Sequence, residues 1–256
     1  MLSIEPVSDE MTNHYEEGNE NSLKKSKKKI PPGSIKNTDV NFPVKMSFYV
    51  TYAFLLTTAT LTFIEAMRTK IPMVRHILNL ETTISIVAAF FYTQFMLKIN
   101  KPHVNFKDIN LNRYADWAIT TPIMLLVLCI SLGYNIKTVA KFSTFLKVLF
   151  FNYGMLLSGY LGETGKTDKM TGTFIGFGFF FLLYLTVYNN FIKGKKSFDN
   201  RLIYWSFVVL WSLYGVSYWL DEQSKNVAFN ILDLFAKCFV GIFFWAYFTK
   251  PINLFK

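Results

Sequence analysis

Two acidic and two basic residues fall within stretches that are otherwise mostly apolar. Asp233 and Lys237 are four residues apart, and Arg113 precedes Asp116 by three, so each pair shares one face if its stretch is helical. An amine that is removed from water loses its proton unless carboxylates hold its charge, and a desolvated amine forms a Schiff base with a carbonyl compound. The spacing therefore predicts either a covalent amine site or a buried ion-pair cluster that fixes helix packing.

Aromatic residues favour the amine site. Trp211, Tyr214 and Tyr218 recur at helical spacing within one apolar stretch, and Trp117 directly follows the first aspartate. Side chains at this spacing can line a long apolar slot beside Lys237, although the same pattern also occurs in ordinary helix packing. Because here they accompany a buried amine, we interpret the cluster as a chemical site.

Seven apolar stretches must position these residues. The chain has 256 residues, 52% of them hydrophobic and 17% charged, and such a composition cannot cover a water-exposed surface. A helix needs about 20 mainly apolar residues to cross a bilayer. The sequence supplies seven such stretches and predicts an all-α bundle of seven transmembrane helices. Their expected bounds are 46–67, 74–98, 109–131, 138–161, 170–192, 201–220 and 227–249.

Charged residues within these spans are expected to face the interior of the bundle. A charged group in hydrocarbon costs about 2.5–3.5 kcal/mol on insertion scales. Glu81 lies well inside the second span and is therefore expected to face inward, like the four residues described first. Glu65 lies near the end of the first span, where its side chain can reach the membrane interface.

The segments outside the spans are polar. Residues 1–41 contain a lysine-rich run at 24–29 and are expected to form a disordered tail. Residues 42–250 are expected to form the membrane domain, and residues 251–256 a short C-terminal tail. No stretch before residue 42 has the apolar core of a signal peptide, so the first span is expected to direct membrane insertion.

Basic residues in the loops predict the orientation of this multi-pass membrane protein. They are more frequent after the first, third, fifth and seventh spans than in the other loops, to which we assign Lys225. Because the more basic side is normally cytoplasmic, we expect an extracellular N-terminus and a cytoplasmic C-terminus. The same loops account for the net charge of +10, so no nucleic-acid partner is expected.

No metal site or disulfide framework is expected. Cys129 and Cys238 both fall within predicted spans, where they are interpreted as packing residues. Neither His76 nor His103 has a second metal ligand at helical spacing.

Three segments resemble the microbial (type 1) rhodopsins. Residues 113–122 (RYADWAITTP) resemble the signature of the third helix of that family, and residues 233–237 (DLFAK) resemble the retinal-attachment segment of the seventh. Residues 211–214 (WSLY) match the sixth-helix pocket, and Tyr92 falls where the family has a tyrosine bonded to the seventh-helix aspartate. The resemblance covers residues 45–250, with the three motifs in the family's order.

The resemblance implies a cofactor and a set of site residues. Lys237 would carry all-trans-retinal as a protonated Schiff base, with Asp116 and Asp233 as its counterion and proton acceptor. The associated polar network would consist of Arg113, Thr120 and Tyr92. The retinal pocket would be lined by Trp117, Thr121, Met155, Gly159, Trp211, Tyr214 and Tyr218.

Two positions depart from the family pattern. Gly215 stands where many relatives have a proline in the sixth helix, so a kink cannot be assumed there. Val127 stands eleven residues after Asp116, where outward proton pumps usually have a carboxyl proton donor. A valine cannot supply a proton.

Two polar pairs have open interpretations. Thr121 and Asn152 would form a hydrogen-bonded bridge between the third and fourth helices, or act only as packing contacts of the kind found in many membrane bundles. Asp221 and Glu222 are interpreted as a solvated helix end, with a group that releases protons or admits cations as the alternative.

Glu81 offers two alternative functions. It lies eleven residues before Tyr92, three turns toward the cytoplasm, where it is either a substitute proton donor or part of a hydrated cation path that includes Asn79. Residues 75–82 (RHILNLET) and 54–65 resemble the first group of rhodopsins of giant algal viruses, members of which are light-gated cation channels. This resemblance favours a light-gated cation channel over an outward proton pump, with a sensory photoreceptor third. No enzymatic activity is expected, and a homo-oligomer is compatible with the sequence.

Overall fold

The computed structural model describes residues 30–139 and 141–249, which fall into two units divided after Ser34. In the first unit, the backbone N–H of Ser34 donates to the carbonyl oxygen of Pro31 in a turn. The second unit is a helical bundle. Two predictions concern residues outside this description. They are the disorder of the N-terminal tail up to residue 29 and the short C-terminal tail at 251–256.

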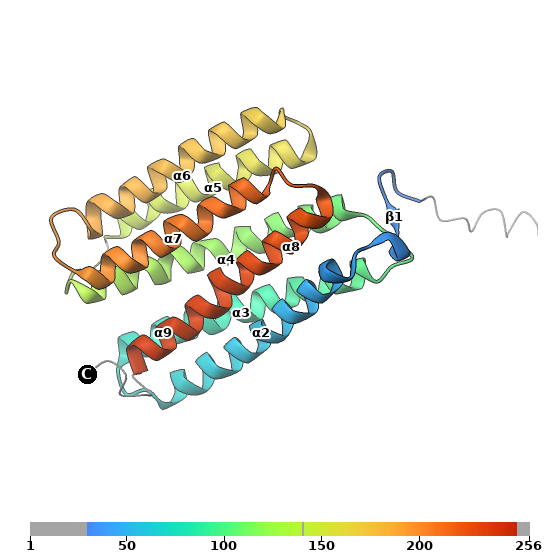
Figure 1. The fold of residues 1–256 in the computed structure, drawn as a ribbon. Coiled ribbons are helices and arrows are strands. Elements are labelled where there is room, and N and C mark those ends of the chain that lie inside the picture. Colours follow the sequence, from blue (N-terminus) through green and yellow to red (C-terminus); the bar gives the residue numbers. More distant parts are fainter. Residues whose placement is uncertain (1–29, 140, 250–256) are drawn as a thin grey trace, which may run out of the picture. The chain divides into compact units, whose positions relative to one another are not determined.

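In the described part of the chain, seven helical rods form the bundle, which confirms the predicted all-α fold. Figure 1 shows how they are arranged. The seventh rod consists of an α-helix, a π-helix and a second α-helix that follow one another directly. Five rods, namely α2, α3, α4, α6 and the rod from α8 to α9, are long and apolar enough to cross a membrane. The bounds are α2 (Phe42–Arg68), α3 (Pro72–Ile99), α4 (Phe106–Asn135), α5 (Phe142–Thr164), α6 (Lys169–Phe191), α7 (Phe198–Ser217), α8 (Glu222–Asp233), η2 (Leu234–Phe239) and α9 (Val240–Thr249).

Helix caps explain where the last two rods differ from the predicted spans. Asp221 accepts hydrogen bonds from the backbone N–H groups of Gln223 and Ser224, so α8 begins at Glu222 rather than at residue 227. The first residues of α8 are mainly polar, so this turn has no apolar pattern in the sequence. Ser197 caps α7 in the same way through the N–H of Asn200, so that helix begins at Phe198 rather than at residue 201. Its end also differs from the prediction and lies at Ser217 instead of residue 220.

The predicted tail boundary at residue 41 is wrong for residues 35–41. β1 (Ile35–Lys36) pairs antiparallel with β2 (His103–Val104), and the short helix η1 (Asn37–Asp39) follows it. The side-chain amide of Asn37 donates to the carbonyl oxygens of Ile99, at the end of α3, and of Lys101, in the turn that follows, at 2.6 and 3.1 Å. Two-residue strands have no periodicity that could reveal them in the sequence.

The bundle has two ends, each with its own set of turns. The end that holds residues 35–41 and the turn between α7 and α8 is called the Glu163 end. The opposite end, with the turns between α2 and α3 and between α6 and α7, is called the Asn200 end. One apolar cluster of the core is built mainly from α4, α6 and α7, and a second mainly from α2 and α3.

Candidate functional site

Lys237 lies in the π-helical segment η2 of the seventh rod, and its side chain is 2% exposed. The Nζ atom lies 2.6 Å from Oδ2 of Asp116 on α4 and 3.3 Å from Oδ1 of Asp233, one turn earlier on its own rod. Single π-helical turns occur frequently at functional sites in α-helices. The structure thus brings the predicted amine between the two predicted carboxylates.

Arg113 supplies a second buried cation to this cluster. Its Nη1 atom lies 3.6 Å from Oδ2 of Asp233, and its side chain is fully buried. The hydroxyl groups of Tyr92 and Tyr214 donate to Asp233 at 2.8 and 2.7 Å. Because two cations face two carboxylates, the cluster carries no net charge, which lowers the cost of burying it.

The two carboxylates have different surroundings. Asp233 accepts hydrogen bonds from two tyrosines and forms an ion pair with the guanidinium of Arg113 at 3.6 Å. Asp116 accepts only from Lys237 through Oδ2, and its buried Oδ1 has no hydrogen-bond partner among the described residues. Thr120, predicted to join this network, donates instead to the backbone carbonyl oxygen of Asp116 at 2.9 Å, as hydroxyls within helices commonly do. Asp116 therefore depends on the amine for its stabilisation as an anion.

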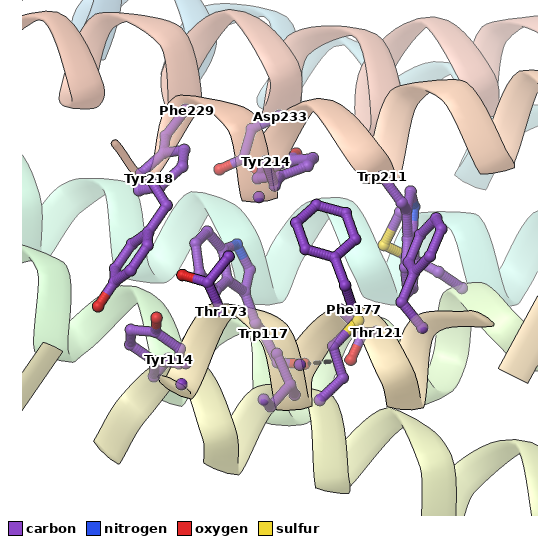
Figure 2. Close-up of a pocket in the computed structure, with 18 of the residues that line it drawn as sticks. Tyr114, Trp117, Thr121, Thr173, Phe177, Trp211, Tyr214, Tyr218, Phe229 and Asp233 are labelled. Carbon is purple, nitrogen blue, oxygen red and sulfur yellow. Dashed lines mark hydrogen bonds between the residues drawn. The ribbon is translucent and has the colours of Figure 1, made fainter. Parts of the chain in front are cut away.

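An apolar pocket lies beside Lys237 (Figure 2). Its wall is formed mainly by apolar and aromatic side chains with a few polar groups, as is usual for small-molecule sites. All seven residues predicted for the retinal pocket lie on its wall. Helix α6 supplies a part of the wall that the sequence analysis missed, although the spacing of its glycines and aromatic residues could have indicated it. These missed residues are Gly172, Thr173, Gly176, Phe177 and Phe180.

Phe177 extends from α6 into this pocket (Figure 2). One of its ring carbons lies 2.5 Å from the position that a Cβ atom on Gly215 of α7 would occupy. A larger residue at 215 would therefore force the ring to move. Helix α7 continues through Gly215 to Ser217, so the departure from the family's proline gives room to an aromatic ring.

The predicted bridge between α4 and α5 is present beside the pocket. The side-chain amide of Asn152 donates to Oγ1 of Thr121 at 2.9 Å. The hydroxyl of Thr121 in turn donates to the backbone carbonyl oxygen of Trp117 at 2.7 Å. The bridge fixes one wall of the pocket relative to the next helix.

Glu81 is buried on α3 and faces α2 and α9. One of its carboxyl oxygens lies 3.1 Å from the position of a Cβ atom on Gly241, beside the methyl group of Thr58. Among residues 30–139 and 141–249, Glu81 forms no ion pair. Asn79 is exposed, so its predicted place in an internal ion path is wrong. Residues two apart on a helix point in nearly opposite directions, and only Glu81 can face inward.

Three charged residues near the Glu163 end differ in burial and in their partners. Lys225, assigned above to a loop, is buried in α8 and 1% exposed, because that helix begins earlier than predicted. Asp221 is the exposed cap of the same helix, and hydrogen bonds from Ser224 hold the pKa of its carboxyl below the ordinary value. Glu222 faces Lys225 at 2.8 Å instead of forming a purely solvated helix end.

Comparison with known proteins agrees with this geometry. The family of bacteriorhodopsin-like proteins matches residues 43–250. The chain belongs to this family. The crystal structure of the viral rhodopsin OLPVRII is 52% identical, with a TM-score of 0.77, and the match covers 82% of this chain and 99% of that one. Acetabularia rhodopsin I, at 20% identity, has the same fold with a TM-score of 0.68, over 82% of this chain and 95% of its own.

A fungal protein is also similar. Opsin-1 of Neurospora crassa is 24% identical over 158 residues, which are 54% of this chain and 49% of Opsin-1. The match therefore spans about half of the length of that relative.

Bacteriorhodopsin-like proteins bind retinal through a Schiff base, and the site of this rhodopsin fits that cofactor. The pocket is lined mainly by apolar and aromatic side chains and holds a buried amine at its wall. Beside that amine, the unpartnered Oδ1 of Asp116 offers a free acceptor within the same cluster. The protein is an integral membrane retinal protein that responds to light.

Proposed function

We propose that this rhodopsin uses light to move protons across the membrane, with Lys237 as the attachment residue, Asp116 as the proton acceptor and Glu81 as the internal proton donor. Retinal, when bound, supplies the absorption of light and the change of shape that follows it. The side chains of the protein hold and move the proton. The observation that carries the proposal is the burial of Glu81, without an ionic partner among the described residues, close to Lys237.

The attachment residue follows from its position. Within the described ranges, Lys237 is the lysine on the wall of the apolar pocket. Its nitrogen lies between two carboxylates, which stabilise a positive charge at that atom. The same nitrogen is therefore suited to hold a proton in the dark.

The acceptor follows from the different surroundings of the two aspartates. Asp233 already accepts hydrogen bonds from Tyr92 and Tyr214 and lies beside Arg113, which together favour its charged form. Asp116 loses most of its stabilisation if the charge on the neighbouring nitrogen moves away. A proton that leaves Lys237 thus finds its most receptive site on Asp116.

The donor follows from the environment of Glu81. A carboxylate without a cation is costly away from water, so Glu81 holds its proton in the dark. Gly241, which contacts Glu81, is four residues after Lys237 on the same rod, so the two functional groups lie about one turn apart along it. Val127, where many relatives have a donor, is buried and cannot carry a proton. Glu81 fills that role from α3.

Apolar residues separate this donor from the Asn200 end. Leu78 lies one turn before Glu81 on α3 and is fully buried in a cluster with Val74 and Ala66. Trp245 and Phe248 of α9 pack against the same cluster. An enclosed carboxyl of this kind can exchange a proton after a transient opening, whereas a cation would need a continuous hydrated path. We take the Asn200 end as cytoplasmic, on the basis of the basic loops.

A light-gated cation channel is the second candidate, because hydroxyl groups form a row along α2 and α3. Thr51, Thr58 and Thr62 are at most 2% exposed on one face of α2, and Thr82 of α3 lies 2.8 Å from Thr62. The buried hydroxyls of Thr58 and Ser85 have no hydrogen-bond partner in the described part of the chain. Water could join these groups into a path if the helices moved apart in the light.

Light-driven acidification and photocurrents together separate the two functions. For a proton pump, illuminated cells that contain retinal acidify the medium, and a protonophore abolishes the signal. Under voltage clamp the current of a pump keeps its direction, whereas the current of a channel reverses with voltage and ion gradient. A photocurrent that reverses with the sodium gradient would establish the channel.

The variant Glu81→Gln tests the donor directly. It keeps the size of the side chain but removes its proton, so recovery of the dark spectrum after a flash should slow by roughly 10²-fold or more. Azide, a small proton carrier, should restore the rate. Glu65→Gln is the matched control, because Glu65 pairs with Arg68 at the end of α2 at 3.0 Å. Unchanged recovery in Glu81→Gln would remove Glu81 from the proton path.

A further inference from the structure

Lys225 is a second buried cation, located at the Glu163 end. Its Nζ atom lies 3.2 and 3.3 Å from the two carboxyl oxygens of Glu163 on α5 and 2.8 Å from Oε1 of Glu222 on its own helix. It also lies 5.6 Å from the centre of the Tyr218 ring. The ammonium group is thus surrounded by oxygen atoms and one aromatic face.

Asparagine side chains connect this group to the central cluster. The amide of Asn110 donates to Glu163 and to Glu222, at 2.7 Å in each case. The amide of Asn226 donates to Oδ1 of Asn110 at 3.1 Å, and Oδ1 of Asn226 accepts from Arg113 at 3.2 Å. Arg113 pairs with Asp233, one of the two carboxylates beside Lys237, so the polar chain leads from Lys225 to the proposed proton path.

The oxygen atoms around Lys225 belong to the types that bind Ca²⁺. Carboxylate oxygens from two elements converge here, and hard divalent cations prefer such ligands. Two carboxylates and one ammonium leave one negative charge in excess, which would attract a further cation. The ammonium of Lys225, however, already occupies the position between the carboxylates.

We propose that Lys225 is a tethered cation that fills a cation site between Glu163 and Glu222 and thereby keeps metal cations out of the proton path at this end. A metal ion entering from the Glu163 end must displace a group that is covalently attached to α8. A proton needs no vacant site, because it passes between hydrogen-bonded groups and water. This inference deepens the proposed function and rests on it for the species that is transported, while the site itself can be tested in the dark.

The test uses the purified, retinal-loaded full chain and the variant Lys225→Met. Calcium is added in the dark, and the temperature at which the visible band bleaches is measured. The variant should show a saturable upward shift of this temperature, with an apparent Kd on the order of 10⁻⁴ to 10⁻³ M. Terbium, used as a luminescent substitute for calcium, should bind the variant and emit on excitation of the nearby aromatic residues. The unsubstituted chain should show neither response.

Two control variants define the site. Lys169→Met also removes a positive charge near Tyr218, whose ring centre lies 4.7 Å from the Lys169 Nζ, but Lys169 pairs with no carboxylate within the described ranges. It should gain no response to calcium. Adding Glu163→Gln to Lys225→Met removes one ligand carboxylate and should abolish the response.

Each outcome decides the inference. Absence of a calcium response in Lys225→Met, or an equal response in the unsubstituted chain, overturns it. Pigment that forms in Lys225→Met only when calcium is present supports it. If neither Lys225→Met nor Lys225→Gln forms pigment with or without calcium, the ammonium is required for folding, and the inference is overturned. Failure of light-driven acidification in the unsubstituted chain would count against the proposed function and leave these binding results unaffected.

Discussion

Lys237 and Lys225 have similar immediate partners but different surroundings. Each is at most 2% exposed and lies between two carboxylates, one of which comes from another helix and one from its own rod. Lys237 also borders an apolar pocket, and Arg113 balances the second carboxylate of its cluster. The carboxylates around Lys225 accept hydrogen bonds from Asn110, and the ion pairs of Lys225 among the described residues include no second cation. A buried lysine between acids is therefore not a chemical site by itself, since the adjoining space decides what can reach the amine.

The two clusters also differ in how their local backbone is built. Lys237 projects from a π-helical segment, whereas Lys225 lies in the first turns of a regular helix capped by Asp221. The π-helical segment changes the direction of side chains relative to a regular helix. The region around Lys237 is thus built to aim one amine into a pocket, and the region around Lys225 to close one end of the bundle.

The largest expected effect is the loss of colour in Lys237→Ala. Without this amine no covalent pigment forms, so the visible band should be absent after addition of retinal. Lys225→Arg, which keeps a cation in the other cluster, should retain the band. The measurement is absorption spectroscopy of the purified protein with borohydride trapping of the linkage. A trappable pigment in Lys237→Ala would transfer the attachment to another residue.

A smaller but still large effect is expected for Asp116→Asn. The substitution removes the charge nearest to Lys237, so part of the pigment should lose its proton at neutral pH and absorb in the near ultraviolet. The protonated remainder should shift to the red, because less negative charge faces the nitrogen. A spectrophotometric pH titration measures both changes. Glu163→Gln makes the corresponding change beside Lys225 and should leave the spectrum in place; an unchanged titration in Asp116→Asn would give its role to Asp233.

Gly215→Ala should have an intermediate effect on stability. Its new methyl group would overlap the Phe177 ring at the pocket, and overpacking of this kind costs about 1–3 kcal/mol. The thermal bleaching temperature should fall, and the double variant Gly215→Ala/Phe177→Leu should recover part of the loss. Gly178→Ala is the control, because a Cβ atom there meets no heavy atom within 4 Å. Equal bleaching temperatures in the native chain and in Gly215→Ala would show that the ring moves freely.

The smallest effect is expected at the cap that positions Lys225. Asp221→Ala removes two hydrogen bonds at the start of α8 and should cost about 0.5–2 kcal/mol. Because the folded-state pKa of Asp221 is lowered, its contribution is present above its ordinary pKa and is lost as the pH falls through the lowered value. Thermal bleaching should therefore differ between Asp221→Ala and the native chain at neutral pH and converge in strong acid. Convergence at neutral pH would show that the cap adds no stability.

Much of the fold and of the candidate site could be predicted from the sequence. Long apolar stretches can satisfy their backbone hydrogen bonds in a bilayer only as helices or closed barrels, and stretches of about 20 residues are long enough for helices. The spacing of Asp233 and Lys237 placed them on one face, and their burial cost required them to point inward. Periodicity along one chain segment is enough for both conclusions.

Tertiary structure alone decided the features that depend on distant segments. The burial of Lys225 depends on Glu163, 62 residues away, and on a polar first turn that has no apolar signal. The Phe177 ring beside Gly215 depends on the packing of α6 against α7, and the order of residues 35–41 depends on pairing with the turn after α3. A sequence states which groups share a helix face, but contacts between helices determine which groups meet.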